Sequence, residues 1–343
     1  MIIVIPHFNS SKYRERNLKC VLHYYLETSE CDIVISEQNG FTDVGIKSDR
    51  ITHITSNFSD STFRKSALIN AGVKECEYVH DIMLVDNDCI LQNDMTFFME
   101  QMSEGYDYYV PFNSINFLNE GHTRQYIRDG KFTQSKGKSH LHVNRYTGGV
   151  IVFTRDLFEK VGGFEESIIG WGKEDDVFLT KCRRTNAFIG RIETDSELLH
   201  LFHPPSSTKE YLNSPQYIKN SKMLALFKRM TDNEFNDYLE LNSGKEEYLD
   251  KLFNDYDKAG KLETKVKVYC GSGYVKFDTS AYTIIPDKDG NVGLEELFKT
   301  AYNEDGEESV AHTIREIDKN CGKLSPDESS IVNKYRKKVR AIL

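Results

Sequence analysis

The first two hundred or so residues alternate short apolar runs with polar, helix-compatible stretches, and this alternation constrains the fold more than any other feature. The apolar runs are uninterrupted, which is typical of strands buried on both faces of a mostly parallel sheet. Helices between such strands cover the two faces of the sheet, so we predict an α/β, doubly wound design. The predicted strands span 2–5, 32–35, 82–85, 106–111 and 149–153, and the predicted helices span 18–26 and 63–73.

The character of the sequence changes after Pro204-Pro205. Residues 206–260 are rich in Lys, Glu, Leu and Tyr and look helical, and the runs at 266–269 and 274–277 resemble a hairpin. Ser325 starts a capping box with proline at the first helical position, which predicts a final helix to about 343. We therefore predict a first domain over 1–205 and a mainly helical, α+β accessory region over 206–343.

Composition excludes several classes of protein. The chain has 343 residues and a net charge of -9, and no apolar run approaches the roughly 20 residues that a membrane helix needs. The first six residues lack the basic segment of a signal peptide and look like a core strand. Seven cysteines without CxxC spacing argue against a disulfide framework and predict free thiols. We therefore expect a soluble, cytoplasmic protein without a membrane span, and the negative charge disfavours broad nucleic-acid binding.

An acidic cluster, Asp86-Asn87-Asp88, directly follows the predicted strand at 82–85. Polar clusters at 6–9 and 37–40 also follow strands, and the carboxyl ends of parallel strands meet at one edge, where ligands bind. Hard carboxylate oxygens suit Mg²⁺ or Mn²⁺, which would bridge the two phosphates of a nucleoside diphosphate. We expect Asp88 to bind the metal directly and Asp86 to meet ribose or the metal through water. A polar turn after a core strand is the simpler alternative.

Two histidines, His200 and His203, are candidate partners for this metal. Imidazole suits Mn²⁺ and other borderline metals. Their His-x-x-His spacing also fits one helical turn, so a zinc site is a competing interpretation that lacks clear third and fourth ligands. Each histidine taken alone is more often a core residue than a ligand, and of the two we favour His203.

The stretch Gly170-Trp171-Gly172-Lys173 leads into three adjacent carboxylates, Glu174-Asp175-Asp176. Glycines permit a tight turn, and the face of the single tryptophan could pack on the C–H face of a sugar. Acidic residues are also favoured in a first helical turn. Three adjacent carboxylates repel one another, however, which raises a pKa toward that of a useful base. We assign the base to Asp175, with Glu174 and Asp176 as acceptor contacts or helix caps.

Several motifs occur together in one order. They are Pro6-x-Phe8-Asn9, Phe63-Arg64-Lys65-x-x-Leu68-Ile69-Asn70-x-Gly72, Asp86-x-Asp88, Gly148-Gly149-Val150, Gly163-Phe164, the Trp171 loop with its carboxylates, and His200-x-x-His203. This ordered set, which spans about residues 1–205, resembles the β-1,4-galactosyltransferase family. It is also similar to the related bacterial chondroitin-polymerase-type and family-2 glycosyltransferases.

The resemblance implies a GT-A fold, a catalytic domain over 1–205, a UDP-sugar donor, dependence on Mn²⁺ (or Mg²⁺) and inversion at the anomeric carbon. It implies that Phe63 and Lys65 lie near uracil or ribose and that the Trp171 loop closes over the donor. The candidate catalytic groups are Asp175 and Glu174, and the candidate metal ligands are Asp88, His203 and His200. The candidate donor contacts are Pro6, Phe8, Phe63, Lys65, Asp86 and Asn87. The candidate acceptor contacts are Trp171 and Asp176.

The sequence also departs from the family pattern. His7 is inserted between Pro6 and Phe8, and the basic residue that the family has after Pro-Phe is absent; Arg14 or Arg16 is the candidate substitute. Lys65 replaces an arginine, Lys173 replaces a glycine, and His200 replaces a metal-binding methionine. Because no membrane anchor precedes the domain, we expect a cytoplasmic bacterial or viral enzyme rather than a Golgi-type one.

The acceptor is the least constrained partner. Glycan chains are the default, and a hydroxylated base in DNA, as some viral glycosyltransferases use, is the alternative. A basic segment could contact phosphate or an acidic glycan, although a solvated loop is the simpler interpretation; it comprises Lys131, Lys136, Lys138, His140, His142 and Arg145. The accessory region could select the acceptor or build a homodimer.

Three rival functions are weaker. A sugar nucleotidylyltransferase would need a glycine-rich, arginine-bearing loop after the first strand, which the residues at 6–9 do not supply. A non-catalytic sugar-binding module is disfavoured by the intact set of carboxylates. A calcium loop starting at Asp287 lacks the glycine at its sixth position and the acid at its twelfth, where Val292 and Phe298 stand.

Overall fold

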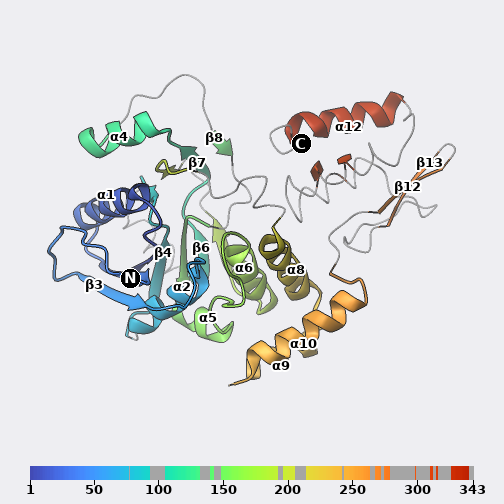
Figure 1. The fold of residues 1–343 in the computed structure, drawn as a ribbon, viewed down its shortest axis with the longest axis horizontal. Helices are drawn as coiled ribbons and strands as arrows, with labels where there is room; N and C mark the ends of the chain where they lie inside the picture. Colours follow the sequence, from blue (N-terminus) through green and yellow to red (C-terminus); the bar gives the residue numbers. More distant parts are fainter. Residues whose placement is uncertain are drawn as a thin grey trace. The chain divides into compact units, whose positions relative to one another are not determined.

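The computed structural model describes most of the first 262 residues and parts of the remainder. The described residues are 1–76, 78–92, 105–131, 140–142, 148–191, 196–204, 214–241, 243–262, 267–271, 274–278, 298, 310–311, 314–315 and 326–339. The chain divides into two compact units, Met1–Ser243 and Gly244–Leu343. All the predicted site residues belong to the first unit, which is drawn in blue through yellow in Figure 1.

The first unit is built on a mixed, mostly parallel sheet that has seven strands within the described residues, in the order β10-β6-β9-β4-β1-β2-β3. The strands are β1 (Ile2–His7), β2 (Asp32–Gln38), β3 (Ile51–Ser56), β4 (Asp81–Val85), β6 (Tyr108–Val110), β9 (Val150–Thr154) and β10 (Ile189–Arg191). Strand β9 runs antiparallel to β4 and β6, and the other pairs are parallel. The predicted α/β fold, a mostly parallel mixed sheet flanked by helices, is confirmed.

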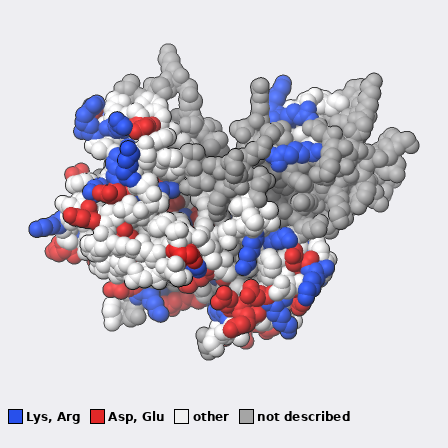
Figure 2. Space-filling model, viewed as in Figure 1, with Lys and Arg blue, Asp and Glu red and all other residues white. Residues whose placement is uncertain are grey.

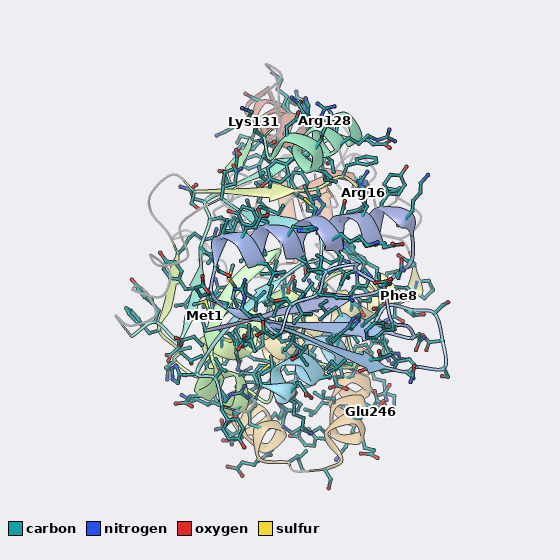
Figure 3. All side chains as sticks on the ribbon, turned by 90° about the vertical axis from the view of Figure 1, so that its left-hand side faces the viewer. Met1, Phe8, Arg16, Arg128, Lys131 and Glu246 are labelled. Atoms are coloured by element: carbon teal, nitrogen blue, oxygen red, sulfur yellow. The ribbon has the colours of Figure 1, made fainter. Side chains whose placement is uncertain are left out.

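The apolar runs seen in the sequence form the core of this sheet. All the residues of β1 and β9 are buried, as are all but the first residue of β4. Helix α1 (Lys12–Thr28) lies on one face of β1–β3 and helix α2 (Lys65–Glu75) on the other, as Figure 3 shows. Burial on both faces explains why these strands read as continuous hydrophobic sequence.

A second, smaller sheet brings distant segments to the edge of the first, and its strand order over the described residues is β5-β11-β7-β8. Its strands are β5 (Cys89–Leu91), β7 (Ser114–Phe117), β8 (His140–His142) and β11 (Glu197–His200). Strand β11 pairs antiparallel with β5, so that His200 lies opposite Cys89. These strands were not predicted, and neither were β3 and β10. Strands of three or four residues depend on pairing rather than on a local pattern. The six-residue β3 contains no buried residue, so it lacks the apolar run of the other long strands. The segment that contains His200 is a strand, not a helical turn.

The remaining helices of the first unit are α4 (Glu120–Asp129), α5 (Arg155–Lys160), α6 (Glu174–Arg184), α8 (Pro215–Arg229) and α9 (Asp232–Glu240). Helices α6 and α8 lie side by side (Figure 1). The buried ammonium of Lys181 in α6 donates to Gly163 O at 2.8 Å and to Tyr238 Oη in α9 at 3.2 Å. Helices α8 and α9 therefore belong to the same compact unit as the sheet, which extends beyond residue 205. The division into a catalytic domain over 1–205 and an accessory region remains a prediction.

The second unit contains helix α10 (Lys245–Lys258), helix α12 (Pro326–Lys338) and an antiparallel hairpin of β12 (Lys267–Gly271) with β13 (Tyr274–Asp278). The predicted hairpin and final helix are thus present. Cys20, Cys31, Cys76, Cys89 and Cys182 are free thiols, as predicted. The calcium loop considered from Asp287 to Asn291 lies outside the described residues.

Helix α2 packs directly on the sheet through Gly72. A Cβ atom at this position would lie 2.6 Å from Val4 Cγ1 and 3.4 Å from Ser36 Cβ. We expect Gly72→Ala to lower the free energy of unfolding by about 1–3 kcal/mol, because overpacking forces the helix away from β1 and β2. Urea unfolding measures this change. The control Lys74→Ala, on the exposed side of the same helix, should stay within about 0.5 kcal/mol of wild type; an unchanged Gly72→Ala variant would contradict the close packing.

Candidate active site

The polar strand ends converge on one edge of the main sheet. Strands β1, β2 and β4 are mutually parallel, so their carboxyl ends meet there, and antiparallel β9 begins at the same edge because Val150 pairs with Val85. In Figure 3, Met1 and Phe8 mark the two ends of β1. The rings of Phe8 and Phe63 stack at this edge, with centroids 5.9 Å apart and planes 13° apart. The predicted donor residues Phe8, Phe63, Asp86 and Asn87 thus lie on neighbouring segments.

A chain of buried polar side chains supports this edge from within. His53 and Thr42 both hydrogen-bond the carboxylate of Glu37, at 2.8 and 2.6 Å. Burial alone raises the pKa of Glu37, but these hydrogen bonds outweigh it and lower the pKa to about 2. Thr42 lies 3.4 Å from Nε2 of His7, whose Nδ1 accepts from Asn87 Nδ2 at 2.6 Å. Glu37 is therefore the anionic anchor of a network that reaches Asn87.

His7 is the residue inserted relative to the family pattern, and it is completely buried in this network. Burial lowers its pKa to about 4 despite the nearby Glu37. The neutral imidazole can hold Asn87 on one nitrogen and Thr42 on the other. The insertion therefore adds a support for the Asp86-Asn87-Asp88 turn rather than a charge at its surface.

The pairing of β5 with β11 brings Asp88, His200 and His203 together. Asp88 immediately precedes β5, and its carbonyl accepts from the backbone N–H of Leu201 at 2.8 Å. His203 Nε2 lies 3.1 Å from Asp88 Oδ2, and His200 Nε2 lies 3.8 Å from Asp88 Oδ1. One ligand atom from each of the three residues lies within 4.8 Å of the others, close enough to hold one metal ion.

Arg14 supplies a positive charge at the same carboxylate. Its guanidinium bonds Asp88 Oδ2 and donates to Asn87 Oδ1 at 3.1 Å. Burial raises the pKa of Asp88, but His200, Arg14 and the hydrogen bond from His203 outweigh it and hold that pKa far below its usual range. Burial lowers the pKa of His200. An anionic carboxylate beside a neutral imidazole is a ligand set that fits a divalent metal.

Lys65 forms a second centre, where one ammonium meets three carboxylates. Its Nζ lies 2.9 Å from Asp86 Oδ1, 3.0 Å from Glu174 Oε1 and 3.3 Å from Asp175 Oδ2, and its side chain is 9% exposed. Burial alone lowers the pKa of Lys65, but the charges of Asp175, Asp86 and Glu174 raise it well above its ordinary value. Lys65 therefore joins the two acidic clusters, which are some eighty residues apart in the sequence. Its contact with uracil or ribose stays a prediction.

Asp175 combines burial with an available oxygen. Burial raises its pKa well above the ordinary value although Lys65 opposes the shift. Its Oδ1 is buried and has no hydrogen-bond partner among the described residues, while Oδ2 takes Lys65. Gly148 borders Oδ2 so closely that a Cβ atom there would collide with it. Such a carboxylate can accept a proton from a hydroxyl group placed beside Oδ1.

The loop before α6 carries Trp171, whose side chain is 41% exposed. Its ring stacks on Tyr217 of α8, with centroids 6.0 Å apart and planes 16° apart. The N–H of Gly170 donates to Phe63 O at 2.8 Å, which ties the loop to the donor side of the edge. Asp176 lies beyond the Lys65 cluster, 3.6 Å from Lys173 Nζ. Both predicted acceptor residues are thus partly exposed to solvent, and their role stays a prediction.

The basic segment proposed as an acceptor contact is largely outside the described residues, which exclude Lys136, Lys138, Arg145 and the side chains of His140 and His142. Lys131 lies near Arg128 at the end of α4 (Figure 3). Arg128 pairs with Asp129. On the face drawn in Figure 2, basic and acidic side chains of the described residues are interspersed.

Comparison with known proteins shows which proteins this chain is similar to. The family described as "N-terminal domain of galactosyltransferase" matches residues 130–204, which contain the Trp171 loop and both histidines. β-1,4-Galactosyltransferase 4 of Cricetulus griseus is 27% identical over 176 residues, covering 51% of this chain and 40% of the relative. β-1,4-Galactosyltransferase 3 of Homo sapiens is 24% identical over 205 residues, covering 56% and 39%. The chain is galactosyltransferase-like.

At the level of sequence, this relationship agrees with the prediction of a glycosyltransferase enzyme. The galactosyltransferase-like chain spans less than half the length of these curated relatives. Among solved structures, GalNAc-T7 with UDP, GalNAc and Mn²⁺ covers 76% of this chain and 53% of its own at 12% identity, with a TM-score of 0.48.

The predicted cytoplasmic location is wrong. The β-1,4-galactosyltransferases that the chain matches are Golgi membrane-type enzymes. The prediction rested on the unpatterned cysteines and on the lack of a signal peptide or membrane anchor in this sequence, and neither observation determines location. Within the part of the chain that the structure describes, no helix is both long and apolar enough to cross a bilayer.

Three contributions to the site escaped the sequence analysis. Lys65 was expected to contact the donor, whereas in the structure its ammonium pairs with Asp175 and Glu174. No local sequence pattern predicts an ion pair between residues so far apart in the chain. Tyr217 and Asn220 of α8 contact the Trp171 loop although they lie beyond residue 205. Ser214 followed by Pro215 is a sequence signal for the start of α8. That signal does not indicate that α8 contacts the Trp171 loop.

Replacement of Lys65 tests its charge. We expect Lys65→Met to cost about 3–5 kcal/mol at neutral pH, because three buried carboxylates lose their cation. Without Lys65, the pKa of Asp175 rises further in the folded state, which then binds more protons than the unfolded state. The stability of the variant relative to wild type should therefore fall as pH rises from about 4, the unfolded carboxyl pKa.

Urea unfolding between pH 5 and 8 measures this slope. The control Lys65→Arg keeps the charge and should retain most of the stability across the range. A Lys65→Met variant that matched wild type at pH 8 would show that the ammonium is not the counter-ion of the cluster.

Proposed function

We propose that this chain is an inverting glycosyltransferase that moves a hexose or an N-acetylhexosamine from a UDP-sugar to a hydroxyl group of a glycan or another acceptor. The observation that carries the proposal is the Lys65 centre, which joins Asp86 of the predicted donor side to Glu174 and Asp175 of the predicted acceptor side. Donor and acceptor chemistry therefore share one edge of the sheet. The relationship to β-1,4-galactosyltransferases supports the same reaction class.

The donor side is assigned to the strand ends around β1 and β4. Pro6, Phe8 and Phe63 would contact the nucleoside, and the stacked rings of Phe8 and Phe63 offer an apolar surface for a base. Asp88, His203 and His200 would hold a divalent metal, Mn²⁺ or Mg²⁺. When bound, this ion would neutralise charge on the diphosphate leaving group. Asp86 and Asn87 lie beside these ligands and would orient the donor.

The acceptor side is assigned to the start of α6. Asp175 Oδ1 would accept the proton of the acceptor hydroxyl while the oxygen attacks the anomeric carbon from the face opposite UDP. The bond between that carbon and the UDP oxygen breaks in the same displacement, which inverts the configuration. Glu174 would share the Lys65 charge and keep Asp175 available, because burial and neighbouring carboxylates raise the pKa of Asp175 toward that of a base.

The mouth of the site is assigned to Trp171 and Asp176. The exposed Trp171 ring would cover the sugar and limit transfer to water. Asp176 would accept hydrogen bonds from the acceptor. A non-catalytic sugar-binding module would have no need for a buried carboxylate with a raised pKa, so the enzyme is the better proposal.

A donor screen tests the reaction class. UDP release is measured for a panel of UDP-sugars with Mn²⁺, first with saccharide acceptors and then without them. We expect one donor to give acceptor-dependent UDP release. Stimulation by none of the acceptors, together with no binding of UDP, would overturn the proposal.

Replacement of the proposed base is the second test. Asp175→Asn should lower kcat by about 100- to 10,000-fold, because the amide cannot accept the proton. Binding of UDP with metal should stay within about threefold of wild type, measured by calorimetry. The control Asp156→Asn changes an exposed aspartate of α5 and should leave kcat unchanged; normal turnover in Asp175→Asn would exclude this residue as the base.

Metal dependence is the third test. We expect EDTA to abolish transfer and Mn²⁺ to restore it. Asp88→Asn and His203→Ala should each weaken Mn²⁺ binding by at least tenfold, because each removes one of three ligands. Mn²⁺ affinity is measured on the protein without substrate by electron paramagnetic resonance. Undiminished Mn²⁺ affinity in both variants would place the metal elsewhere.

A further inference from the structure

The loop that carries Trp171 is fastened to helix α8 by Asn220. The side-chain amide of Asn220 donates to Ile169 O at 2.9 Å and to Gly172 O at 3.1 Å, so it bonds the backbone on both sides of the tryptophan. Asn220 is fully buried, and its own oxygen accepts from Gln216 at 2.9 Å. A buried amide with these bonds is costly to leave unpaired, which favours the docked position of the loop.

Tyr217, one turn earlier on α8, supports the tryptophan directly. Its ring lies beneath Trp171, and Lys173 Nζ lies 5.7 Å from the centroid of the same ring. A Cβ atom on Gly172 would lie only 3.1 Å from Tyr217 Cε2, so the loop backbone sits against the tyrosine. Tyr217 is buried, and Trp171 covers it while keeping one part of its own ring exposed.

The backbone of this loop needs such support. Gly170, Gly172 and Lys173 have φ values of 78°, 94° and 81°. A left-handed conformation is easy for glycine but unfavourable for lysine, so surrounding contacts must hold it. The contacts on α8 are those of Asn220 and Tyr217, and the other end of the loop bonds Phe63 O. The position of Trp171 therefore depends on a helix that follows the residues predicted to be catalytic.

We propose that Asn220 and Tyr217 are positioning residues that set where Trp171 stands and thereby control the affinity for the acceptor. This inference rests on the proposed function, since it assigns Trp171 to acceptor binding. Neither residue contacts Asp88, His200 or His203 in the described part of the chain, so we expect binding of UDP with metal to be independent of this contact. Helix α8 then contributes to acceptor recognition from outside the residues 130–204 that match the galactosyltransferase family.

The test uses the fact that Trp171 is the only tryptophan of the chain. Its fluorescence reports the position of this loop without any turnover. Asn220→Asp keeps the shape but removes both donors, and we expect a shifted emission maximum and stronger acrylamide quenching. Acceptor KM should rise about five- to thirtyfold, as the loss of two ordinary hydrogen bonds predicts. kcat at saturating acceptor and the Kd for UDP with Mn²⁺ should stay within about twofold.

Two further variants separate positioning from general stability. Tyr217→Phe keeps the ring and should retain wild-type fluorescence and acceptor KM, whereas Tyr217→Leu should reproduce the Asn220→Asp changes. Lys219→Ala, exposed on the same helix, is the matched control and should change neither. If Asn220→Asp does not fold, the two Tyr217 variants decide the question by themselves.

The outcomes distinguish this inference from the proposed function. Wild-type fluorescence and wild-type acceptor KM in folded Asn220→Asp or Tyr217→Leu would overturn the positioning role, even with active enzyme. If the wild type binds neither UDP nor Mn²⁺, the proposed function fails, and the fluorescence of the variants still shows whether α8 holds the loop. A raised KM without any change in fluorescence would also overturn the inference, because the effect would not pass through Trp171.

Discussion

The buried ammonium of Lys65 is the interaction on which the rest of the site depends. It binds carboxylates from two segments that lie 21 and 110 residues away from it in the sequence. A single positive charge cannot neutralise Asp86, Glu174 and Asp175 together. The site therefore keeps an excess of negative charge at the edge of the sheet. Burial and the neighbouring carboxylates together raise the pKa of Asp175. A charge centre of this kind both fastens α6 to the sheet and leaves one carboxylate ready to take a proton.

The proposed metal side is organised by different means. Here β5 and β11 place His200 beside Asp88 by strand register, and a hydrogen-bonded chain from Glu37 through His7 steadies Asn87. Arg14 balances the Asp88 carboxylate in this structure. The two sides meet in the three-residue turn from Asp86 to Asp88, where Asp86 faces Lys65 and Asp88 faces the histidines. Alternate residues of one turn thus serve two charge centres, which explains why an Asp-x-Asp spacing is needed here.

Much of this could be predicted from the sequence, although unevenly. The apolar runs predicted β1, β2, β4, β6 and β9, because a strand buried on both faces needs an uninterrupted apolar sequence. The short strands β5, β7, β8, β10 and β11 were not predicted because they depend on pairing, and β3 was not predicted because it contains no buried residue. The candidate residues Asp88, His200 and His203 proved to be neighbours, as did Lys65, Asp86, Glu174 and Asp175. The cytoplasmic location was wrong, since it was argued from cysteine spacing and from the lack of a signal peptide or anchor, which do not determine location. The predicted domain boundary at 205 precedes α8 and α9, and no sequence pattern indicated that these helices belong to the same compact unit as α6.

The sequence by itself determined the order of the buried strands, the side-chain types at their ends and the resemblance to galactosyltransferases. These follow from local composition and spacing, which any chain shows before it folds. Only the tertiary structure decided which carboxylates share Lys65, that Arg14 lies on Asp88, and that Asn220 fastens the Trp171 loop. The reason is that each of these depends on burial and on distances between residues far apart in the chain, and packing alone sets both.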